Sequence, residues 1–281
     1  MATSGPRCGR IDYTNDLPVY AAFDEGALSF PGSVRAGVPA ELNRALLAGD
    51  LDCSPISSFF YAQHADELVL LPGVCIGSRG AVRSIVCVSA TPPQRLSDAP
   101  IAVTKESATG RALFEAICRS RFGFAPSLVE ADDPYASYLE GGACIVIGDK
   151  AIDAALAAPA AHVHDLGVLW HEQFQTPMVY AVWASRREFA AREPHALRAV
   201  GDALAGALAW GFAHPDRVLD RAQRAHPRPE GFYAEYYRGL LFAFDAEAQA
   251  GLSRFFSVAA ACGMLAAAPD LTFVDGALER V

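Results

Sequence analysis

The sequence contains few charged residues, and basic residues are the scarcer kind. Only 20% of its 281 residues are charged, and 32 Asp plus Glu against 23 Lys plus Arg give a formal net charge of −9. A chain this acidic has no general attraction for phosphate backbones or anionic membrane surfaces. We therefore expect neither a nucleic acid nor a membrane among its partners, although a local pocket can still accept an anionic ligand.

Long apolar runs and a leader segment are also absent. The opening residues MATSGPRCGR contain no hydrophobic stretch of the kind that a secretory signal peptide needs. Charges interrupt the longest apolar stretches well before they reach the length of a membrane span. These absences predict a cytoplasmic protein.

The cysteine pattern and the missing motifs narrow the chemistry. The seven cysteines form no C-x-x-C pair, and most lie in apolar runs such as residues 84–88, which is typical of buried free thiols. Cys53 and Cys144 have no recognisable base nearby in the sequence, so neither is expected to be a nucleophile. No G-x-S-x-G, P-loop or G-x-G-x-x-G motif is present, which disfavours nucleophilic, phosphoryl-transfer and hydride chemistry.

Up to about residue 185, short β-like runs alternate with helical runs, and 52% of all residues are hydrophobic, enough for a sizeable core. The expected strands span residues 8–11, 33–36, 51–56, 68–76, 81–89, 101–104, 127–130, 143–147, 163–166 and 179–183. The expected helices span residues 40–48, 58–65, 111–122 and 149–157. This alternation predicts a three-layer α/β architecture with mostly parallel sheets.

The remainder of the chain is predominantly helical. Helices are expected at residues 194–213, 215–225, 230–242 and 246–262, followed by a short apolar run at residues 271–274. Such a tail cannot form a sheet domain of its own, so we expect it to pack onto the first lobe. The Pro-rich segment 91–100 suits a crossing between lobes, with the return near residues 184–187. These features predict a ligand cleft between lobe 1, residues 1–92 and 185–281, and lobe 2, residues 93–184.

Small polar residues follow four predicted strands where helices begin. They lie in Tyr13–Pro18, at Ser57 and Ser58, in residues 106–110, and at Gly148 and Asp149. Ligands of α/β proteins bind at the carboxyl ends of strands, where the free N–H groups of helix N-termini favour carboxylates. Each junction alone is explained by helix capping. Four in one chain favour a shared cleft.

Two further features have competing interpretations. The segment Arg79–Ser84 and the residues just before it carry two arginines and two glycines, Gly77 and Gly80, which suits either an anion site at a strand edge or an exposed turn with solvated arginines. His162 and His164 would share one face of a strand, as a pair of metal ligands does, but no third ligand lies at a usable spacing. We therefore expect no metal site.

GRIDYTNDLPVY at residues 9–20 opens a series of motifs. It resembles the G-R-I-x-Y-x-N-x-x-P signature of the menaquinone-biosynthesis chorismate dehydratase family of the futalosine pathway. Residues 46–58 resemble its L-x-x-G-x-L-D-x-x-x-I-S-S segment, and residues 75–84 its C-I-x-S-x-G-x-V-x-S segment. An S-x-T turn at residues 107–109, I-G-D at 147–149, D-L-G at 165–167 and T-P at 176–177 complete a match over residues 8–185.

The resemblance implies a type II periplasmic-binding-protein-like fold and the dehydration of chorismate to 3-[(1-carboxyvinyl)oxy]benzoate, which makes the protein a hydro-lyase. It places Asn15 and Ser84 in the active site as catalytic residues. The expected substrate-binding residues, which would cradle the two carboxylates of chorismate, are Ser57, Ser58, Ser107, Thr109, Gly148 and Asp149. The resemblance implies no metal and no organic cofactor. The sequence allows a homodimer but contains no motif for one.

The chain departs from the family pattern at two positions, and rival functions remain. Asp12 replaces the usual Ser before the signature Tyr, and Gly110 replaces a Ser after the S-x-T turn. The sister enzyme, 1,4-dihydroxy-6-naphthoate synthase, typically has S-P-C-P-N-D-T in its first turn, of which only Asn-Asp is shared. Prephenate dehydratase has a T-R-F hallmark that this chain lacks. A binding or sensing protein without catalysis on the same fold is the alternative from another class.

Overall fold

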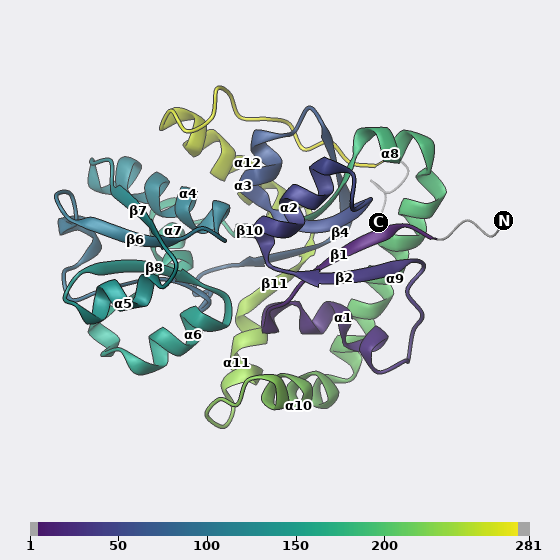
Figure 1. The fold of residues 1–281 in the computed structure, drawn as a ribbon, viewed down its shortest axis with the longest axis horizontal. Coiled ribbons are helices and arrows are strands. Elements are labelled where there is room, and N and C mark those ends of the chain that lie inside the picture. The colour runs from purple at the N-terminus through teal and green to yellow at the C-terminus, as the bar shows by residue number, and fades with distance from the viewer. Residues whose placement is uncertain (1–4, 275–281) are drawn as a thin grey trace.

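The computed structural model describes residues 5–274, which form two lobes (Figure 1). A six-stranded sheet of order β11-β4-β10-β3-β1-β2 forms the core of lobe 1, and a five-stranded sheet of order β7-β6-β8-β5-β9 forms that of lobe 2. The strands are β1 Arg7–Ile11, β2 Ser33–Gly37, β3 Cys53–Ser57, β4 Leu68–Ser78, β5 Ile85–Ser89, β6 Pro100–Thr104, β7 Ser127–Ala131, β8 Ala143–Ile147, β9 Val163–Asp165, β10 Met178–Arg186 and β11 Leu240–Phe244. The two-lobed α/β fold is as predicted.

Twelve α-helices lie among the described residues. They are α1 Leu17–Asp24, α2 Pro39–Ala48, α3 Ser58–Gln63, α4 Ala108–Ile117, α5 Pro134–Leu139, α6 Gly148–Ala157, α7 Leu166–Phe174, α8 Arg187–Arg192, α9 Pro194–Ala213, α10 Pro215–Ala225, α11 Phe232–Gly239 and α12 Ala246–Ala261. Helix α2 illustrates why they form: Pro39 opens it and Gly49, with φ +83°, ends it in the left-handed conformation that glycine adopts without strain.

The prediction of mostly parallel sheets is wrong, because both sheets are mixed. In lobe 1, β10 is antiparallel to both of its neighbours, β3 and β4, and β11 is antiparallel to β4. In lobe 2, β5 is antiparallel to β8 and β9. The antiparallel strands are those that follow a passage between lobes or the helical tail. The alternation of strands and helices in the sequence does not report the direction in which such a strand enters its sheet.

Both crossings between lobes were predicted one strand too late. The chain leaves lobe 1 after Ser78 and enters the second sheet at Ile85, so the first crossing is residues 79–84. The return lies between Phe174 and Met178. Strand β5 therefore belongs to lobe 2 and β10 to lobe 1, which contradicts the boundaries placed at residues 92 and 184. The Pro-rich segment 91–100 is a loop within lobe 2.

The C-terminal helices pack onto lobe 1 as expected, and one of them also reaches lobe 2. Helix α9 lies along α1, and α12 contacts β10 and β11 of lobe 1 as well as α4 of lobe 2. The predicted helix 230–242 is wrong in its second half, where the chain forms β11 at the sheet edge. The run LLFAF buries four of its five side chains there, because pairing with β4 satisfies its backbone and covers its apolar residues.

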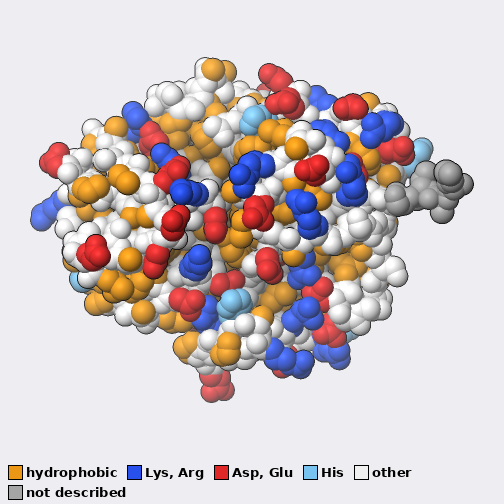
Figure 2. Space-filling view, viewed as in Figure 1, with side chains coloured by type: hydrophobic (Ala, Val, Ile, Leu, Met, Phe, Trp, Pro, Cys, Tyr) orange, Lys and Arg blue, Asp and Glu red, His pale blue; other side chains and the backbone are white. Residues whose placement is uncertain are grey.

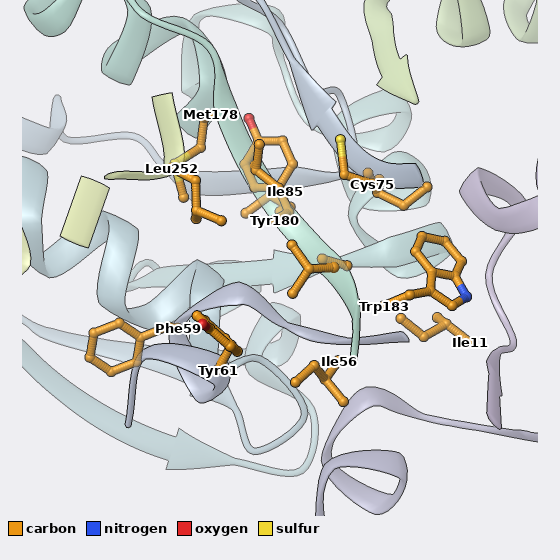
Figure 3. Close-up of a cluster of buried hydrophobic side chains, with 14 of the residues drawn as sticks. Ile11, Ile56, Phe59, Tyr61, Cys75, Ile85, Met178, Tyr180, Trp183 and Leu252 are labelled. Atoms are coloured by element: carbon orange, nitrogen blue, oxygen red, sulfur yellow. The ribbon is translucent and has the colours of Figure 1, made fainter. Parts of the chain in front are cut away.

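One apolar core extends across the junction of the lobes (Figure 3). Phe59 of α3 and Trp170 of α7 both contact the Phe255 ring, with ring centroids 6.1 and 5.7 Å apart. The three rings come from an early segment, from lobe 2 and from the C-terminal helix. Because one side chain of α12 packs against both lobes, the tail stabilises their arrangement as well as the fold of lobe 1.

A single carboxylate joins the first crossing to the start of α7. Asp165, at the end of β9, accepts hydrogen bonds from the amides of Val82 (3.1 Å) and Arg83 (2.6 Å) in the first crossing. It also accepts from the amides of Gly167 (2.9 Å) and Val168 (3.1 Å), which open α7 before the return crossing. Arg83 is held at φ +60°, a left-handed conformation that is unfavourable for a residue with a side chain. Asp165 therefore fixes a strained segment immediately before Ser84.

The surface carries both signs of charge close together. Figure 2 shows acidic and basic side chains mixed over the visible face rather than gathered into patches of one sign. Within residues 5–274, no helix has the length and apolar character needed to cross a lipid bilayer.

Replacing Asp165 by Ala is expected to lower the free energy of unfolding by about 2–4 kcal/mol, because buried N–H groups on two segments lose their acceptor. The control is Asp133→Ala, which removes an exposed helix cap at α5 and should cost about 1 kcal/mol. Urea unfolding followed by circular dichroism measures both values. Equal losses in the two variants would contradict the role of Asp165.

Candidate functional site

A small cavity lies between the lobes and collects most of the predicted site residues. Its volume is ≈ 60 Å³. The lining residues are Ile11, Tyr13, Asn15, Pro39, Ser57, Ile76, Ser84, Ile85, Glu106, Ser107, Thr109, Gly110, Ile147, Gly148, Tyr180 and Ala181. Both catalytic candidates are present, as are Ser57, Ser107, Thr109 and Gly148. The other two predicted binding residues, Ser58 and Asp149, are not among the lining residues.

Asn15 reaches the cavity from η1 (Thr14–Asp16), a single 3-10 turn between β1 and α1. Its side-chain amide makes no hydrogen bond with any of the residues that the structure describes. The turn itself has no side-chain cap from its own preceding residue, Tyr13. Asn15 therefore presents a free donor and a free acceptor to the space between the lobes.

Ser84 lies in the first crossing rather than in a strand, which corrects the predicted strand 81–89. Its hydroxyl donates to the carbonyl oxygen of Val82 at 3.3 Å, and its own carbonyl accepts the Gly148 amide at 2.8 Å. The side chain is buried and lines the cavity. A weak internal bond of this length is readily exchanged for one to a ligand, so Ser84 remains available for binding.

Ser58 and Thr109 contact each other across the cleft. Their hydroxyl oxygens are 3.3 Å apart, and the Phe59 amide at the start of α3 donates to the Thr109 hydroxyl at 3.1 Å. Ser58 also donates to the carbonyl of Val179 at 2.7 Å, and it is fully buried. The side chain of Ser58 thus stabilises the closed arrangement. Because the Thr109 hydroxyl accepts the Phe59 amide, this N–H group at the start of α3 is not free to bind a carboxylate.

Ser107 caps α4 and lines the cavity at the same time. Its hydroxyl accepts the Gly110 amide at 3.0 Å. A Cβ atom on Gly110 would lie 2.4 Å from that hydroxyl oxygen and 3.2 Å from the side chain of Ile147. The glycine that departs from the family pattern therefore leaves room for the cap, and a serine here would require Ser107 to move.

Asp149 turns away from the cavity and contacts the other lobe. Its carboxylate accepts the Thr14 amide at 3.0 Å and the Thr14 hydroxyl at 2.5 Å. Its neighbour Gly148 has φ +64° and lies so close to the Tyr13 ring that a Cβ would be 2.9 Å from it. The predicted contact between Asp149 and a ligand is therefore not supported by this geometry, whereas Gly148 does face the cavity.

Sequence reasoning missed Tyr13, Glu106 and Tyr180 as lining residues. The Tyr13 hydroxyl donates to Glu106 at 3.1 Å, and Tyr180 shares a hydrogen bond of 2.8 Å with Ser78. Burial beside Glu106 raises the pKa of the Tyr13 hydroxyl well above its usual range, so it stays protonated. Glu106 supplies the one carboxylate among the lining residues. Its place directly before Ser107, in a junction already singled out, was the available signal.

The small volume shows that the lobes are closed on one another. Organic ligands occupy pockets of roughly 300–1,000 Å³, whereas this cavity measures ≈ 60 Å³. A wider depression of ≈ 400 Å³ adjoins it at Glu106 and Ser107 and is lined by both lobes. An organic ligand therefore fits the inner cavity only if the lobes separate.

The remaining predicted features have other roles. Arg79 pairs with Glu247 at 2.7 Å and Arg83 with Glu235 at 3.1 Å, and all four side chains are exposed to solvent, so the two arginines form surface ion pairs. His162 accepts or donates a 2.9 Å hydrogen bond with Tyr138. Within residues 5–274, no three His, Cys, Asp or Glu side chains are grouped so that they could hold a metal ion.

Asp16 is a fully buried ionisable group beside the site. It follows Asn15, is 1% exposed, and neither carboxylate oxygen has a hydrogen-bond partner among the described side chains. Burial raises its pKa to about 7, against the opposing attraction of Arg10. Asp24, which pairs with Arg10 at 2.7 Å, adds a repulsion that raises the pKa further. In mildly acidic solution Asp16 is therefore a protonated carboxyl, and it lies in the same turn as Asn15.

The two lobes, the crossings and the cleft define a protein with a periplasmic-binding-protein-like fold. The structure of the periplasmic aliphatic sulphonate binding protein from Escherichia coli is similar, with a TM-score of 0.65 and 15% identity, over 96% of this chain and 91% of that chain. At this level of identity the likeness concerns the fold alone.

A family model for menaquinone biosynthesis matches residues 6–261, and the chain therefore belongs to the menaquinone-biosynthesis family. It is 36% identical over 166 residues to a chorismate dehydratase from Thermus thermophilus, an alignment that covers 54% of this chain and 60% of that relative. It is also 28% identical over 283 residues to a 1,4-dihydroxy-6-naphtoate synthase from the same organism, covering 95% of this chain and 98% of that one. The family resemblance found in the sequence is confirmed.

The pH dependence of stability should report on Asp16. Folded Asp16 keeps its proton up to a pH of about 7, whereas an unfolded aspartate loses it near pH 3.9. Between these values the folded state binds more protons, so this group makes stability fall as the pH rises from about 4 to 7. Asp16→Asn removes that loss. At pH 8 the free energy of unfolding of this variant should exceed that of the native chain by up to roughly 4 kcal/mol.

Urea unfolding at several pH values from 4 to 8 measures this difference. Asp12→Asn, which alters an exposed carboxylate on the same segment, is the matched control. A constant difference between the Asp16→Asn variant and the native chain across this range would contradict the assignment.

Proposed function

We propose that the protein is a chorismate dehydratase, which removes water from chorismate to give 3-[(1-carboxyvinyl)oxy]benzoate. The observation that carries this proposal is the closed cavity in which Asn15 and Ser84 meet the starts of α4 and α6. The 36% identity to a chorismate dehydratase supports it. Chorismate has two carboxylates and a ring hydroxyl, and these groups match neutral donors and helix N-termini around a shielded space.

The reaction requires little from the protein beyond positioning. A ring proton and the neighbouring hydroxyl leave together as water, and the ring becomes aromatic, which favours the products. A closed cleft can hold the substrate in a reactive conformer and exclude bulk water. Asn15, with its free amide, is proposed to hydrogen-bond the leaving hydroxyl. Ser84, Ser107 and the N–H groups at the start of α6 are proposed to hold the carboxylates.

The acceptor of the ring proton is proposed to be a carboxylate of the substrate itself. Asp149 is bonded to Thr14 through both of its oxygens, so it is not free to act as a base in the closed arrangement. Glu106 lines the cavity, but one of its carboxylate oxygens already accepts a hydrogen bond from the Tyr13 hydroxyl. A substrate carboxylate, in contrast, is carried to the reacting centre with the substrate.

The naphthoate synthase reaction is the second candidate, because that relative aligns over 95% of this chain. The first turn typical of the naphthoate synthases shares only Asn15 and Asp16 with this sequence. The dehydratase signature also matches at Gly9, Arg10 and Tyr13. The signature therefore favours the dehydratase.

Purified protein incubated with chorismate is expected to release one water, detected by ultraviolet absorbance and mass spectrometry. Asn15→Ala should lower kcat by about 10²–10³-fold, which corresponds to roughly 3–4 kcal/mol for one preorganised donor. Ser84→Ala should chiefly raise KM, and Ser253→Ala, an exposed serine of α12, is its matched control. Near-native turnover of Asn15→Ala would remove the proposed role.

Two other outcomes would replace the proposed function. Thermal stabilisation by chorismate without turnover would indicate a binding protein. If chorismate is neither turned over nor stabilises the protein, the same assay should be repeated with the substrate of the naphthoate synthase.

Glu106→Gln tests the proton acceptor. It should leave kcat within a few-fold of the native value and lower KM, because it removes a negative charge from a cavity that receives a dianion. Steady-state kinetics with chorismate separate the two parameters. A loss of kcat beyond 100-fold would identify Glu106 as the base instead.

A further inference from the structure

The contact between Asp149 and Thr14 joins the two lobes beside the candidate catalytic residue. Asp149 belongs to α6 of lobe 2, and Thr14 opens η1 of lobe 1. Both residues are buried, at 7% and 3% exposure. One carboxylate oxygen takes the backbone amide and the other takes the hydroxyl, which fixes both the position and the orientation of Thr14. The next residue along the chain is Asn15.

The geometry of this contact is that of a helix cap supplied from the opposite lobe. The first N–H groups of any helical turn lack partners within it and need an acceptor from elsewhere. The residue before η1, Tyr13, provides no side-chain cap. The N-cap residue of α6, Ile147, makes no side-chain cap either, and both oxygens of the Asp149 carboxylate are directed to Thr14. Its carboxylate therefore serves the turn that carries Asn15.

Two further contacts hold the same turn and the same helix. Tyr237 of α11 donates its hydroxyl to the Thr14 carbonyl at 2.8 Å, within lobe 1. Arg228, in the loop before α11, donates to Asp153 at 2.5 Å and to the Asp149 carbonyl at 3.4 Å, across to lobe 2. Arg228 thus joins the lobes without touching Thr14. Of these contacts, only the Asp149 carboxylate both crosses the cleft and binds η1.

We infer that Asp149 is a positioning residue whose carboxylate sets the orientation of Asn15 only when the lobes are closed. Separation of the lobes withdraws Asp149 from Thr14 and leaves the first N–H group of η1 without its acceptor. Closure around a ligand restores both hydrogen bonds and brings the Asn15 amide to its working position. The catalytic donor is therefore assembled by closure.

This inference rests on the proposed function for its kinetic test, and it predicts a specific split of kinetic parameters. Asp149→Asn retains one acceptor but loses the second, so kcat for chorismate should fall about 10²-fold, as for a small misplacement of a reacting group. KM should change by less than about threefold, because Asp149 does not touch the substrate. Thr14→Val should also lower kcat, and Thr14→Ser, which keeps the hydroxyl, should restore it.

The double variant and a matched control separate positioning from a general weakening of closure. Asp149→Asn combined with Thr14→Val should be no slower than the slower single variant, because both changes remove the same interaction. Asp153→Asn breaks the contact with Arg228 on the same helix and should leave kcat within twofold. A tenfold increase in KM with unchanged kcat in Asp149→Asn would show that Asp149 contacts the substrate, and would overturn the inference.

A measurement without substrate keeps the inference separate from the proposed function. Amide hydrogen exchange at residues 13–17 should be faster in Asp149→Asn than in the native chain, and unchanged in Asp153→Asn. If the native chain fails to dehydrate chorismate, the proposed function fails, while this exchange pattern still supports the contact. If the chain is active and exchange at residues 13–17 is the same in all three proteins, the inference alone fails.

Discussion

The site depends on the partly buried carboxylate of Asp165, which accepts hydrogen bonds from amides of the first crossing between the lobes and from amides at the start of α7 in lobe 2. Four charge-assisted hydrogen bonds on one acceptor bring the start of α7 against the strained segment at Arg83. Ser84 directly follows Arg83 and lines the cavity, so the hydrogen bonds of Asp165 fix the first crossing and the position of Ser84 together.

Away from Asp165, the two sides of the cleft are joined by neutral hydrogen-bond donors and by carboxylates that contact the opposite lobe. Tyr13 bonds Glu106, and Thr14 bonds Asp149, while Ser58 and Thr109 meet hydroxyl to hydroxyl. No lysine or arginine is among the residues that line the cavity. A dianionic ligand must therefore be held by hydroxyls and helix N-termini, which stabilise charge by orientation rather than by a counter-ion. Such a site is completed by closure, since most of its donors come from different lobes.

Local pattern allowed much of the fold to be predicted. The bounds of α9 and α10 follow from prolines at their first positions and from their apolar spacing, and β8 follows from an unbroken apolar run between turn residues. The crossings were misplaced because a Pro-rich loop has the composition of a linker, whereas residues 79–84 look like the start of a strand. Whether neighbouring strands run parallel or antiparallel could not be predicted either, because strand direction depends on partners that are distant in the sequence.

The sequence by itself determined the family, the two-lobed architecture and the presence of Asn15, Ser84, Ser107 and Gly148 at the junctions, because these depend on motifs and on short-range capping. Only the tertiary structure decided what each junction faces. Asp149 and Ser58 lie next to residues that line the cavity, yet their side chains contact the opposite lobe. Glu106 and Tyr180 line the cavity although neither was predicted to be a site residue. The physical reason is that a side chain's partner across a cleft is fixed by the relative placement of two sheets, and no local pattern encodes that placement.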